Sequence, residues 1–281
     1  MRRALHEENR LSWNEATRAH NRHKGDQAAF LRGGGSTLFP EEIELLGDVR
    51  GKRLVHLQCN AGQDTLSLAK HLGAEVLGVD ISDEAIDFAQ RLSAESGIPG
   101  RFVRSDVYDF LGRTEERFDV AFASYGAICW LSDLEAWARG VERILTPGGR
   151  LVLVEFHTAA QMFDEKGVRR YPFSTFGKPW TWDAGVSDYV AASGEGLTPQ
   201  GAQAAAATFE NPHRCHEFIW GLGELVSAVA GSGLRVELLR EWPWSNGFRF
   251  LDDMEMREGR RWYPTGPAMP VMYGLTAAKP G

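Results

Sequence analysis

Polar residues stand where the first apolar run of the chain ends and a helical pattern begins. The segment VHLQCNAGQD, residues 55–64, forms this corner and keeps a single glycine, Gly62. The start of a helix at such a corner exposes free backbone N–H groups, which bind polar or anionic ligands. Asn tolerates left-handed backbone angles, so Asn60 can replace a turn glycine, and Gln58 is expected to reach a ligand with its side chain. The corner is either a ligand-binding turn with unusual residues or an ordinary strand-to-helix connection.

Acids close the next two apolar runs. Asp80 ends the run 75–80, 18 residues after Gly62, at the place where an acid accepts hydrogen bonds from ribose hydroxyls. Asp106 ends the run 101–106 and could hold an adenine amino group. One such acid alone is more often a helix cap, but three consecutive runs that end in polar residues favour a bound nucleoside.

The elements that must position these residues follow from the alternation of short apolar runs with helical patterns between residues 53 and 157. This alternation predicts a parallel sheet covered by helices on both faces. Strands are expected at 53–59, 75–80, 101–106, 118–126, 150–156, 234–244 and 270–279, and helices at 63–73, 82–97, 134–145 and 215–233. A short alanine run at 202–207 is expected to form a helix or an exposed turn.

With these elements in place, the chain resembles a class I S-adenosylmethionine-dependent methyltransferase. The resemblance covers roughly residues 50–157, the last helix and two strands, and it rests on HLQCNAGQDT, GVDIS, RSDVYDF, FDVAFASYG and LTPGGRLVLVEF. It implies a Rossmann-like α/β fold, a seven-stranded, mostly parallel sheet with an antiparallel last strand, helices on both faces and lid insertions. It also implies S-adenosyl-L-methionine as the cofactor and S-adenosyl-L-homocysteine as the product.

The first turn departs from the family pattern. The family usually has an acid at the position of His56 and glycines at those of Gln58 and Asn60, and its turn faces the methionine part of the cofactor. The residues expected to contact the cofactor, on the resemblance and the strand ends together, are Trp13, His20, Gln58, Asn60, Gly62, Gln63, Asp80, Ile81, Ser82, Asp106, Val107 and Ser124.

The resemblance divides the chain into a core and three additions. The core is expected at 38–157 and 213–281, and residues 1–37 are expected to form a helical cap that closes over the cofactor. Residues 158–212 leave the last strand of the first half and are expected to form a lid that binds substrate. Residues 245–269 are expected to form an active-site loop, because they connect two antiparallel strands at the same edge.

Aromatic residues and histidines supply candidates for the acceptor site. Six of the nine tryptophans lie between residues 180 and 262, either as an apolar cluster under the lid or as the wall of a pocket for a flat acceptor. His157 follows a strand at the active edge and is the first candidate for a general base, with His20 next. Tyr125 is expected to position cofactor or acceptor. The expected substrate pocket comprises Tyr125, Trp180, Trp182, His216, Trp244 and Trp262.

Composition narrows the class of protein. The chain has 281 residues, a net charge of −7 and a pI near 5.7, which argues against a broad nucleic-acid-binding surface. It has no run of about 18 apolar residues, so no membrane span is expected. Its three cysteines are odd in number and far apart, which favours the reducing cytoplasm. HRCHE, residues 213–217, lacks the spacing of a zinc protease, and no metal is expected.

The sequence therefore predicts methyl transfer to a small organic acceptor, which the tryptophans suggest could be aromatic. It does not indicate whether an O, N, S or C atom is methylated. It does not indicate the oligomeric state of the protein either. A cofactor-binding protein without turnover and a protein methyltransferase stay open as alternatives. A nicotinamide dehydrogenase is disfavoured, because only one glycine of G-x-G-x-x-G is present.

Overall fold

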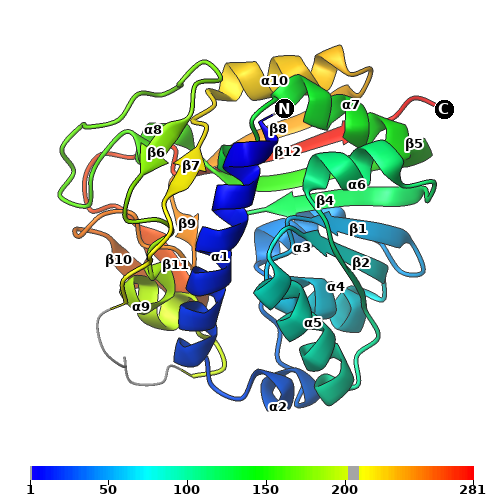
Figure 1. Ribbon diagram of the computed structural model, residues 1–281, viewed down its shortest axis with the longest axis horizontal. Helices are drawn as coiled ribbons and strands as arrows, with labels where there is room; N and C mark the ends of the chain where they lie inside the picture. The colour runs from blue at the N-terminus through cyan, green and yellow to red at the C-terminus, as the bar shows by residue number, and fades with distance from the viewer. Residues whose placement is uncertain (1, 202–208) are drawn as a thin grey trace.

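Figure 1 shows the computed structural model, which describes residues 2–201 and 209–281. The alanine run expected as a helix or turn at 202–207 lies outside the described residues. Of the described helices, none is both long enough and apolar enough to span a membrane.

The centre of the fold is a seven-stranded sheet in the order β3-β2-β1-β4-β5-β12-β8. The neighbouring pairs among the first five strands are parallel, and β12 is antiparallel to both β5 and β8. This arrangement confirms the expected fold class. The strands are β1 (Arg53–Leu57), β2 (Glu75–Asp80), β3 (Arg101–Arg104), β4 (Phe118–Ser124), β5 (Leu145–Phe156), β8 (Arg235–Trp242) and β12 (Met272–Ala278).

Helices cover both faces of this sheet because each presents one apolar stripe to it. One hydrophobic cluster, which includes the fully buried Trp137, packs one face of the sheet against α6, α7 and α10. A second cluster, which includes Leu46 and Leu68, packs the other face against α3 and α4. Burying a side chain of this size contributes about 1.5–3 kcal/mol. These helices, with α5, are α3 (Pro40–Leu46), α4 (Gln63–Leu72), α5 (Asp83–Ser96), α6 (Val107–Arg113), α7 (Leu134–Ile144) and α10 (Leu222–Gly231).

The helix expected at 215–233 is shorter than predicted. Its first residues instead form β7 (Cys215–Glu217), which pairs antiparallel with β6 (Trp180–Trp182) in a separate two-stranded sheet. The helix starts after Gly221, whose backbone N–H donates a hydrogen bond of 2.8 Å to Glu224. The apolar pattern continues across both elements, so periodicity alone does not separate them.

Most of the segments outside the alternating core lie together beyond one end of the sheet, whereas residues 27–32 pack against α5 (Figure 1). The long helix α1 (Arg3–His23) crosses in front of the sheet and contacts α5, β7 and α9. A three-stranded sheet in the order β10-β11-β9 forms within 245–269. The remaining elements are α2 (Gln27–Arg32), η1 (Ile128–Trp130), α8 (Thr158–Gln161), α9 (Tyr189–Ser193), η2 (Gly194–Gly196), β9 (Ser245–Asn246), β10 (Glu255–Arg257), η3 (Glu258–Arg260) and β11 (Arg261–Tyr263).

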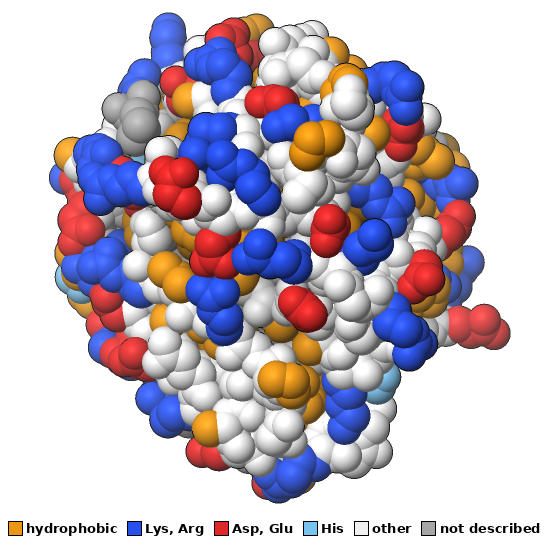
Figure 2. Space-filling model, turned by 90° about the vertical axis from the view of Figure 1, so that its right-hand side faces the viewer, with side chains coloured by type: hydrophobic (Ala, Val, Ile, Leu, Met, Phe, Trp, Pro, Cys, Tyr) orange, Lys and Arg blue, Asp and Glu red, His pale blue; other side chains and the backbone are white. Residues whose placement is uncertain are grey.

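The surface carries both signs of charge. On the face shown in Figure 2, Lys and Arg side chains alternate with Asp and Glu side chains and do not form a large patch of one sign. Many charged side chains of the described residues are paired, as between Arg18 and Glu84 or Arg53 and Glu116. Exposed pairs of this kind contribute little to stability, typically about 0–1 kcal/mol each.

Candidate active site

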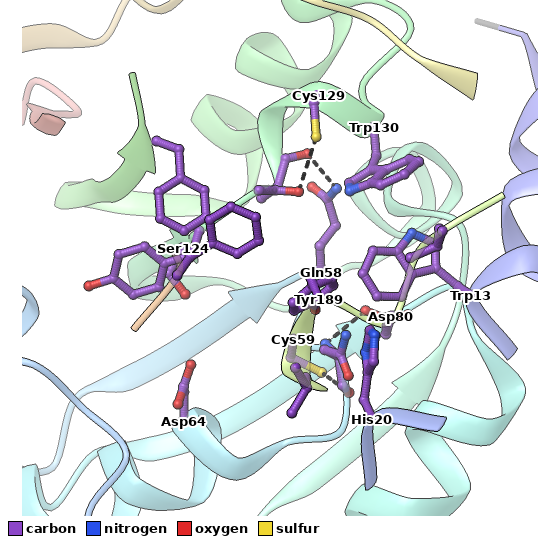
Figure 3. Close-up of a pocket in the computed structure, with 18 of the residues that line it drawn as sticks. Trp13, His20, Gln58, Cys59, Asp64, Asp80, Ser124, Cys129, Trp130 and Tyr189 are labelled. Carbon is purple, nitrogen blue, oxygen red and sulfur yellow. Dashed lines mark hydrogen bonds between the residues drawn. The ribbon is translucent and has the colours of Figure 1, made fainter. Parts of the chain in front are cut away.

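A cavity of about 640 Å³ lies where the carboxyl ends of β1, β2 and β4 meet α1 and the insertions. This volume suits a small-molecule or cofactor site. Figure 3 shows side chains from these elements converging on it, among them Asp80, Ser124 and Trp13. The expected residues that line it are Trp13, His20, Gln58, Asn60, Gln63, Asp80, Ile81, Asp106, Val107, Ser124, Tyr125 and Trp182.

The first turn holds two non-glycine residues in the left-handed region, Gln58 with φ 56° and Asn60 with φ 47°. Both side chains form hydrogen bonds: Gln58 Nε2 donates to the carbonyl of Ala127, distant in the chain, at 2.8 Å, and Asn60 Oδ1 accepts from the adjacent Ala61 N–H at 2.6 Å. The family pattern places glycines at these two positions, and these bonds help to hold the same backbone path without them.

Gln58 Oε1 is buried and has no hydrogen-bond partner in the structure. An amide oxygen can only accept, so a ligand that donates a hydrogen bond here would satisfy it. The ammonium group of a bound methionine moiety is such a donor. The turn thus fits S-adenosylmethionine even though its glycines are replaced.

Asp80 lies at the end of β2 and is oriented by backbone groups. Its Oδ2 accepts from the Asn60 N–H at 2.8 Å and its Oδ1 accepts from the Ser82 N–H at 2.9 Å. Burial raises the pKa of Asp80, and these hydrogen bonds oppose that shift. Each carboxylate oxygen keeps a further lone pair, which can accept from a ribose hydroxyl.

Asp106 is tied to the cap helix as well as to its own helix. Its Oδ1 accepts from the Tyr108 N–H at 2.8 Å and caps α6, and its Oδ2 lies 2.7 Å from Nδ1 of His6. The His6 ring stacks on Tyr108, with ring centroids 5.4 Å apart. Burial acts to raise the pKa of Asp106, but the hydrogen bonds from His6 and the Tyr108 N–H, together with the charge of Arg3, outweigh burial, so the pKa is lowered. No pattern in the sequence pointed to His6 as a residue of the site.

Two residues expected to contact the cofactor are not on the cavity wall, and both have structural roles. Gly62, at φ 79°, precedes α4, and a Cβ there would lie 2.7 Å from Ala89 Cβ and 2.8 Å from the Phe102 ring. Glycine at this position lets the turn pack closely against Ala89 of α5 and Phe102 of β3. Ser82 caps α5 by accepting from the Ala85 N–H, and its hydroxyl donates to Asn14 of α1 at 2.7 Å.

The first candidate base, His157, also lies off the cavity wall. Its Nδ1 accepts from the Ala159 N–H at 2.9 Å, and its Nε2 lies 2.9 Å from Oε1 of Glu241 on β8. The strand delivers residue 156 to the cavity instead, because side chains alternate between the two faces of a strand. His20 does line the cavity, with Nε2 2.9 Å from the Ser187 carbonyl, and burial lowers its pKa to about 4.

Most of the expected acceptor residues point elsewhere. Trp182 lines the cavity and donates from Nε1 to Glu217, also on the wall, at 2.7 Å. The structure pairs His216 with Glu8, and Trp244 with Glu41. The four expected pocket residues that do not line the cavity are Trp180, His216, Trp244 and Trp262.

Part of the cavity wall is built from phenylalanines that sequence reasoning missed. The Phe156 ring lies 5.2 Å from that of Phe248 and 4.9 Å from that of Phe250, and Tyr189 packs 5.7 Å from Phe248. Such aromatic pairs gain about 0.5–1.5 kcal/mol beyond the burial of their area. The signal was present in GFRF, residues 247–250, where alternate residues are aromatic.

The loop after β4 is held by one buried carboxyl group. Glu155 accepts hydrogen bonds from the N–H groups of Gly126, Ala127 and Ile128. Burial raises the pKa of Glu155, and the backbone donors oppose that shift. This loop carries Tyr125, at φ 42°, and the carbonyl that fixes Gln58.

His56 stands where the family usually has an acid, and it is buried and neutral. Its Nδ1 lies 2.8 Å from Thr65 Oγ1 and its Nε2 lies 3.4 Å from Ser124 Oγ. Burial lowers its pKa to about 4. Unlike an acid at this position, a neutral His56 adds no negative charge beside the first turn.

A mostly parallel sheet with a ligand cavity beyond the carboxyl ends of its strands defines a Rossmann-like α/β protein. Residues 55–149 match a family model described as a methyltransferase domain. With this match, the seven-stranded topology and the polar strand ends, the chain is similar to the class I S-adenosylmethionine-dependent methyltransferases.

Named relatives carry the same similarity. A UbiE ubiquinone/menaquinone biosynthesis C-methyltransferase of Azotobacter vinelandii is 32% identical over 158 residues, which cover 54% of this chain and 62% of the relative. An S-adenosyl-L-methionine-dependent Diels-Alderase of Talaromyces variabilis is 33% identical over 112 residues, 37% of this chain and 36% of that protein. This chain spans about three-fifths of the length of the first relative.

A solved structure shows the same fold over nearly the whole chain. The CcbJ methyltransferase of Streptomyces caelestis covers 97% of this chain and 99% of its own, with a TM-score of 0.60 and 15% sequence identity. The sheet and its covering helices are therefore shared, while most side chains differ.

Proposed function

We propose that the protein transfers a methyl group from S-adenosylmethionine to a small organic acceptor. The observation that carries this proposal is that one cavity joins the polar ends of β1, β2 and β4 to a cluster of aromatic side chains. The sulfonium methyl group is already activated, so the protein needs mainly to align a nucleophile with it.

The cofactor would lie along the strand ends. Asp80 would accept hydrogen bonds from the ribose, with Ile81, Asp106 and Val107 beside the adenine. Trp13 and His20 of α1 would cover this part of the cavity from above the sheet.

The methionine part would lie at the first turn. The unpartnered Gln58 oxygen would accept from the ammonium group, with Asn60, Gln63 and Ser124 beside it. Lys24 of the segment after α1 also lines the cavity, and burial lowers its pKa to about 8, with Asp64 opposing the shift. It remains a cation at pH 7 and would attract the methionine carboxylate.

The acceptor would fill the aromatic end, between Phe156, Phe248 and Tyr189, which suits a flat or aromatic molecule. Tyr125, at the end of β4, would position the acceptor. Its ring packs 5.5 Å from that of Phe156. The His20 ring also lies 4.2 Å from that of Tyr189, so it reaches the aromatic end. With a pKa of about 4 it is neutral at pH 7, and it is the histidine proposed as a base if the acceptor loses a proton.

Two alternatives remain as outcomes of the test. The Diels-Alderase relative is named for a cycloaddition that depends on S-adenosylmethionine, so binding without methyl transfer is the second candidate function. A protein side chain as acceptor is less favoured, because α1 and the two insertions surround the cavity. We propose a cytoplasmic location, which the free cysteines Cys59, Cys129 and Cys215 support.

The decisive experiment separates binding from turnover. S-adenosylmethionine and S-adenosylhomocysteine are titrated into the protein by calorimetry, and then methyl-labelled cofactor is supplied with a set of phenols, hydroquinones, amines and thiols. We expect binding and transfer of label to a small aromatic compound. Binding without transfer to any compound would favour the second candidate, and the absence of binding would refute both.

A further inference from the structure

Asn246 is a buried polar residue on the cavity wall with no role in the proposal above. It lies on the short strand β9, and 1% of its surface is exposed. Its neighbours place it at the acceptor end of the cavity, because it bonds Tyr125, whose ring packs against Phe156.

The orientation of the Asn246 amide is fixed by its nitrogen. Nδ2 donates to Oε2 of Glu41 at 2.9 Å and to the Tyr125 hydroxyl at 2.8 Å. Glu41 in turn is paired with Arg261, whose guanidinium lies 2.7 Å from Oε1. A flipped amide would put its oxygen against the Glu41 carboxylate, so this orientation is the favoured one.

With both amide hydrogens used, Oδ1 of Asn246 is left buried and without a hydrogen-bond partner. Such an atom has lost its contacts with water and gained nothing in return. The residue lines a cavity that is large enough for a ligand, and a ligand donor that reaches Oδ1 would supply the missing bond.

We propose that Asn246 determines acceptor specificity: its amide oxygen accepts a hydrogen bond from an O–H or N–H group of the acceptor. This inference rests on the proposed function, since it assigns the acceptor class to the same cavity. The acceptor is an aromatic molecule with a hydroxyl or N–H group, and a capped analogue without that hydrogen leaves the buried oxygen unsatisfied. A site built to bind a donor discriminates strongly against an analogue that lacks it.

The test uses two matched probes, 2-naphthol and 2-methoxynaphthalene, and the whole protein saturated with S-adenosylhomocysteine. Their rings are the same, and only the first can donate a hydrogen bond. Dissociation constants are measured by quenching of tryptophan fluorescence. We expect the wild type to bind 2-naphthol about tenfold more tightly, the ratio that corresponds to about 1.4 kcal/mol.

Three variants assign this preference to one oxygen. Asn246→Ala should lose the preference, whereas Asn246→Gln keeps an amide that donates to Glu41 and accepts from the probe, and it should retain a preference for 2-naphthol. Ser245→Ala is the matched control, because Ser245 is equally buried on the same strand but does not line the cavity. It should retain the full preference.

The outcomes separate this inference from the proposed function. Equal affinity of the wild type for both probes, or no binding of either, overturns the role of Asn246, and so does a full preference in Asn246→Ala. Failure to bind S-adenosylhomocysteine instead overturns the proposed function. The comparison of the two probes in the wild type stands even if Asn246→Ala does not fold.

Discussion

The backbone N–H of Asn60 donates a hydrogen bond of 2.8 Å to Oδ2 of Asp80. This bond joins the first turn to the end of the next strand, two segments that are 20 residues apart in the chain. It fixes the carboxylate before any ligand binds, and such preorganisation reduces the entropy lost on binding. The turn and the acid therefore act as one unit.

Asp80→Ala should weaken the binding of S-adenosylhomocysteine by about 1.5–3 kcal/mol, because hydrogen bonds to a charged acceptor are lost. Calorimetry measures this change directly. Asp83→Ala is the control, since Asp83 follows closely in the chain but pairs with Arg10 and Arg104 outside the cavity. Equal affinity of the wild type and Asp80→Ala would remove Asp80 from the site.

Replacing both Gln58 and Asn60 with glycine should preserve folding and weaken cofactor binding. Both residues have positive φ, which glycine adopts without strain. The double variant loses the unpartnered Gln58 oxygen, so we expect an affinity loss of about 1–3 kcal/mol by calorimetry. Unchanged or tighter binding would show that the turn binds through its backbone alone.

The sequence predicted the fold well because the apolar runs of β1 to β5 are local signals. Each strand and the helix after it can be recognised within a window of about 15 residues. The boundary at β7 was missed because Cys215–Glu217 owes its strand conformation to pairing with β6, which is distant in the sequence. Tertiary pairing of this kind overrides local preference.

The site was predicted only in part, for a related reason. Asp80 ends β2, and Gln58 and Asn60 follow β1, so their place on the cavity wall could be derived. Phe248 and Asn246 reach the cavity through the sheet β10-β11-β9, whose position depends on long-range packing. His157 was predicted to be a general base because it follows β5. Side chains alternate along the strand, however, so Phe156 faces the cavity and His157 points away from it.

Gly62→Ala should destabilise the fold more than Gly97→Ala, although both glycines have a positive φ. The new Cβ would clash with Ala89 and Phe102, and overpacking costs about 1–3 kcal/mol beyond the strain of positive φ. Gly97→Ala is the control, since Gly97 has φ 70° and nothing within 4 Å of its Cβ position. Urea unfolding should show a larger loss for Gly62→Ala; equal losses would mean that the packing adjusts.

His157→Ala should leave turnover and cofactor affinity near those of the wild type and lower stability. The variant loses the cap on Ala159, and caps contribute about 0.5–2 kcal/mol. Thermal unfolding and methyl transfer to the acceptor found by screening measure the two effects. A fall in turnover of about 10²-fold or more at full cofactor affinity would restore His157 as a base.

The stability of the protein should fall as pH drops from about 6.5 towards 4, and His56 should account for part of this fall. Burial lowers the pKa of His56 from 6.5 to about 4 in the folded state. Between these values the unfolded chain binds a proton at this residue and the folded chain does not, so stability rises with pH across the window.

The full contribution of His56 is present above pH 6.5 and is lost as pH falls through 4, a total of about 3 kcal/mol at 1.36 kcal/mol per pKa unit. His56→Gln cannot titrate and can keep a hydrogen bond to Thr65, whose hydroxyl lies 2.8 Å from the imidazole. Urea unfolding at several pH values should therefore show a shallower loss for His56→Gln than for the wild type. If His56 bound its proton equally well in the folded and unfolded states, the plots of stability against pH would be parallel for the wild type and His56→Gln. That result would contradict a neutral, buried His56 beside Ser124.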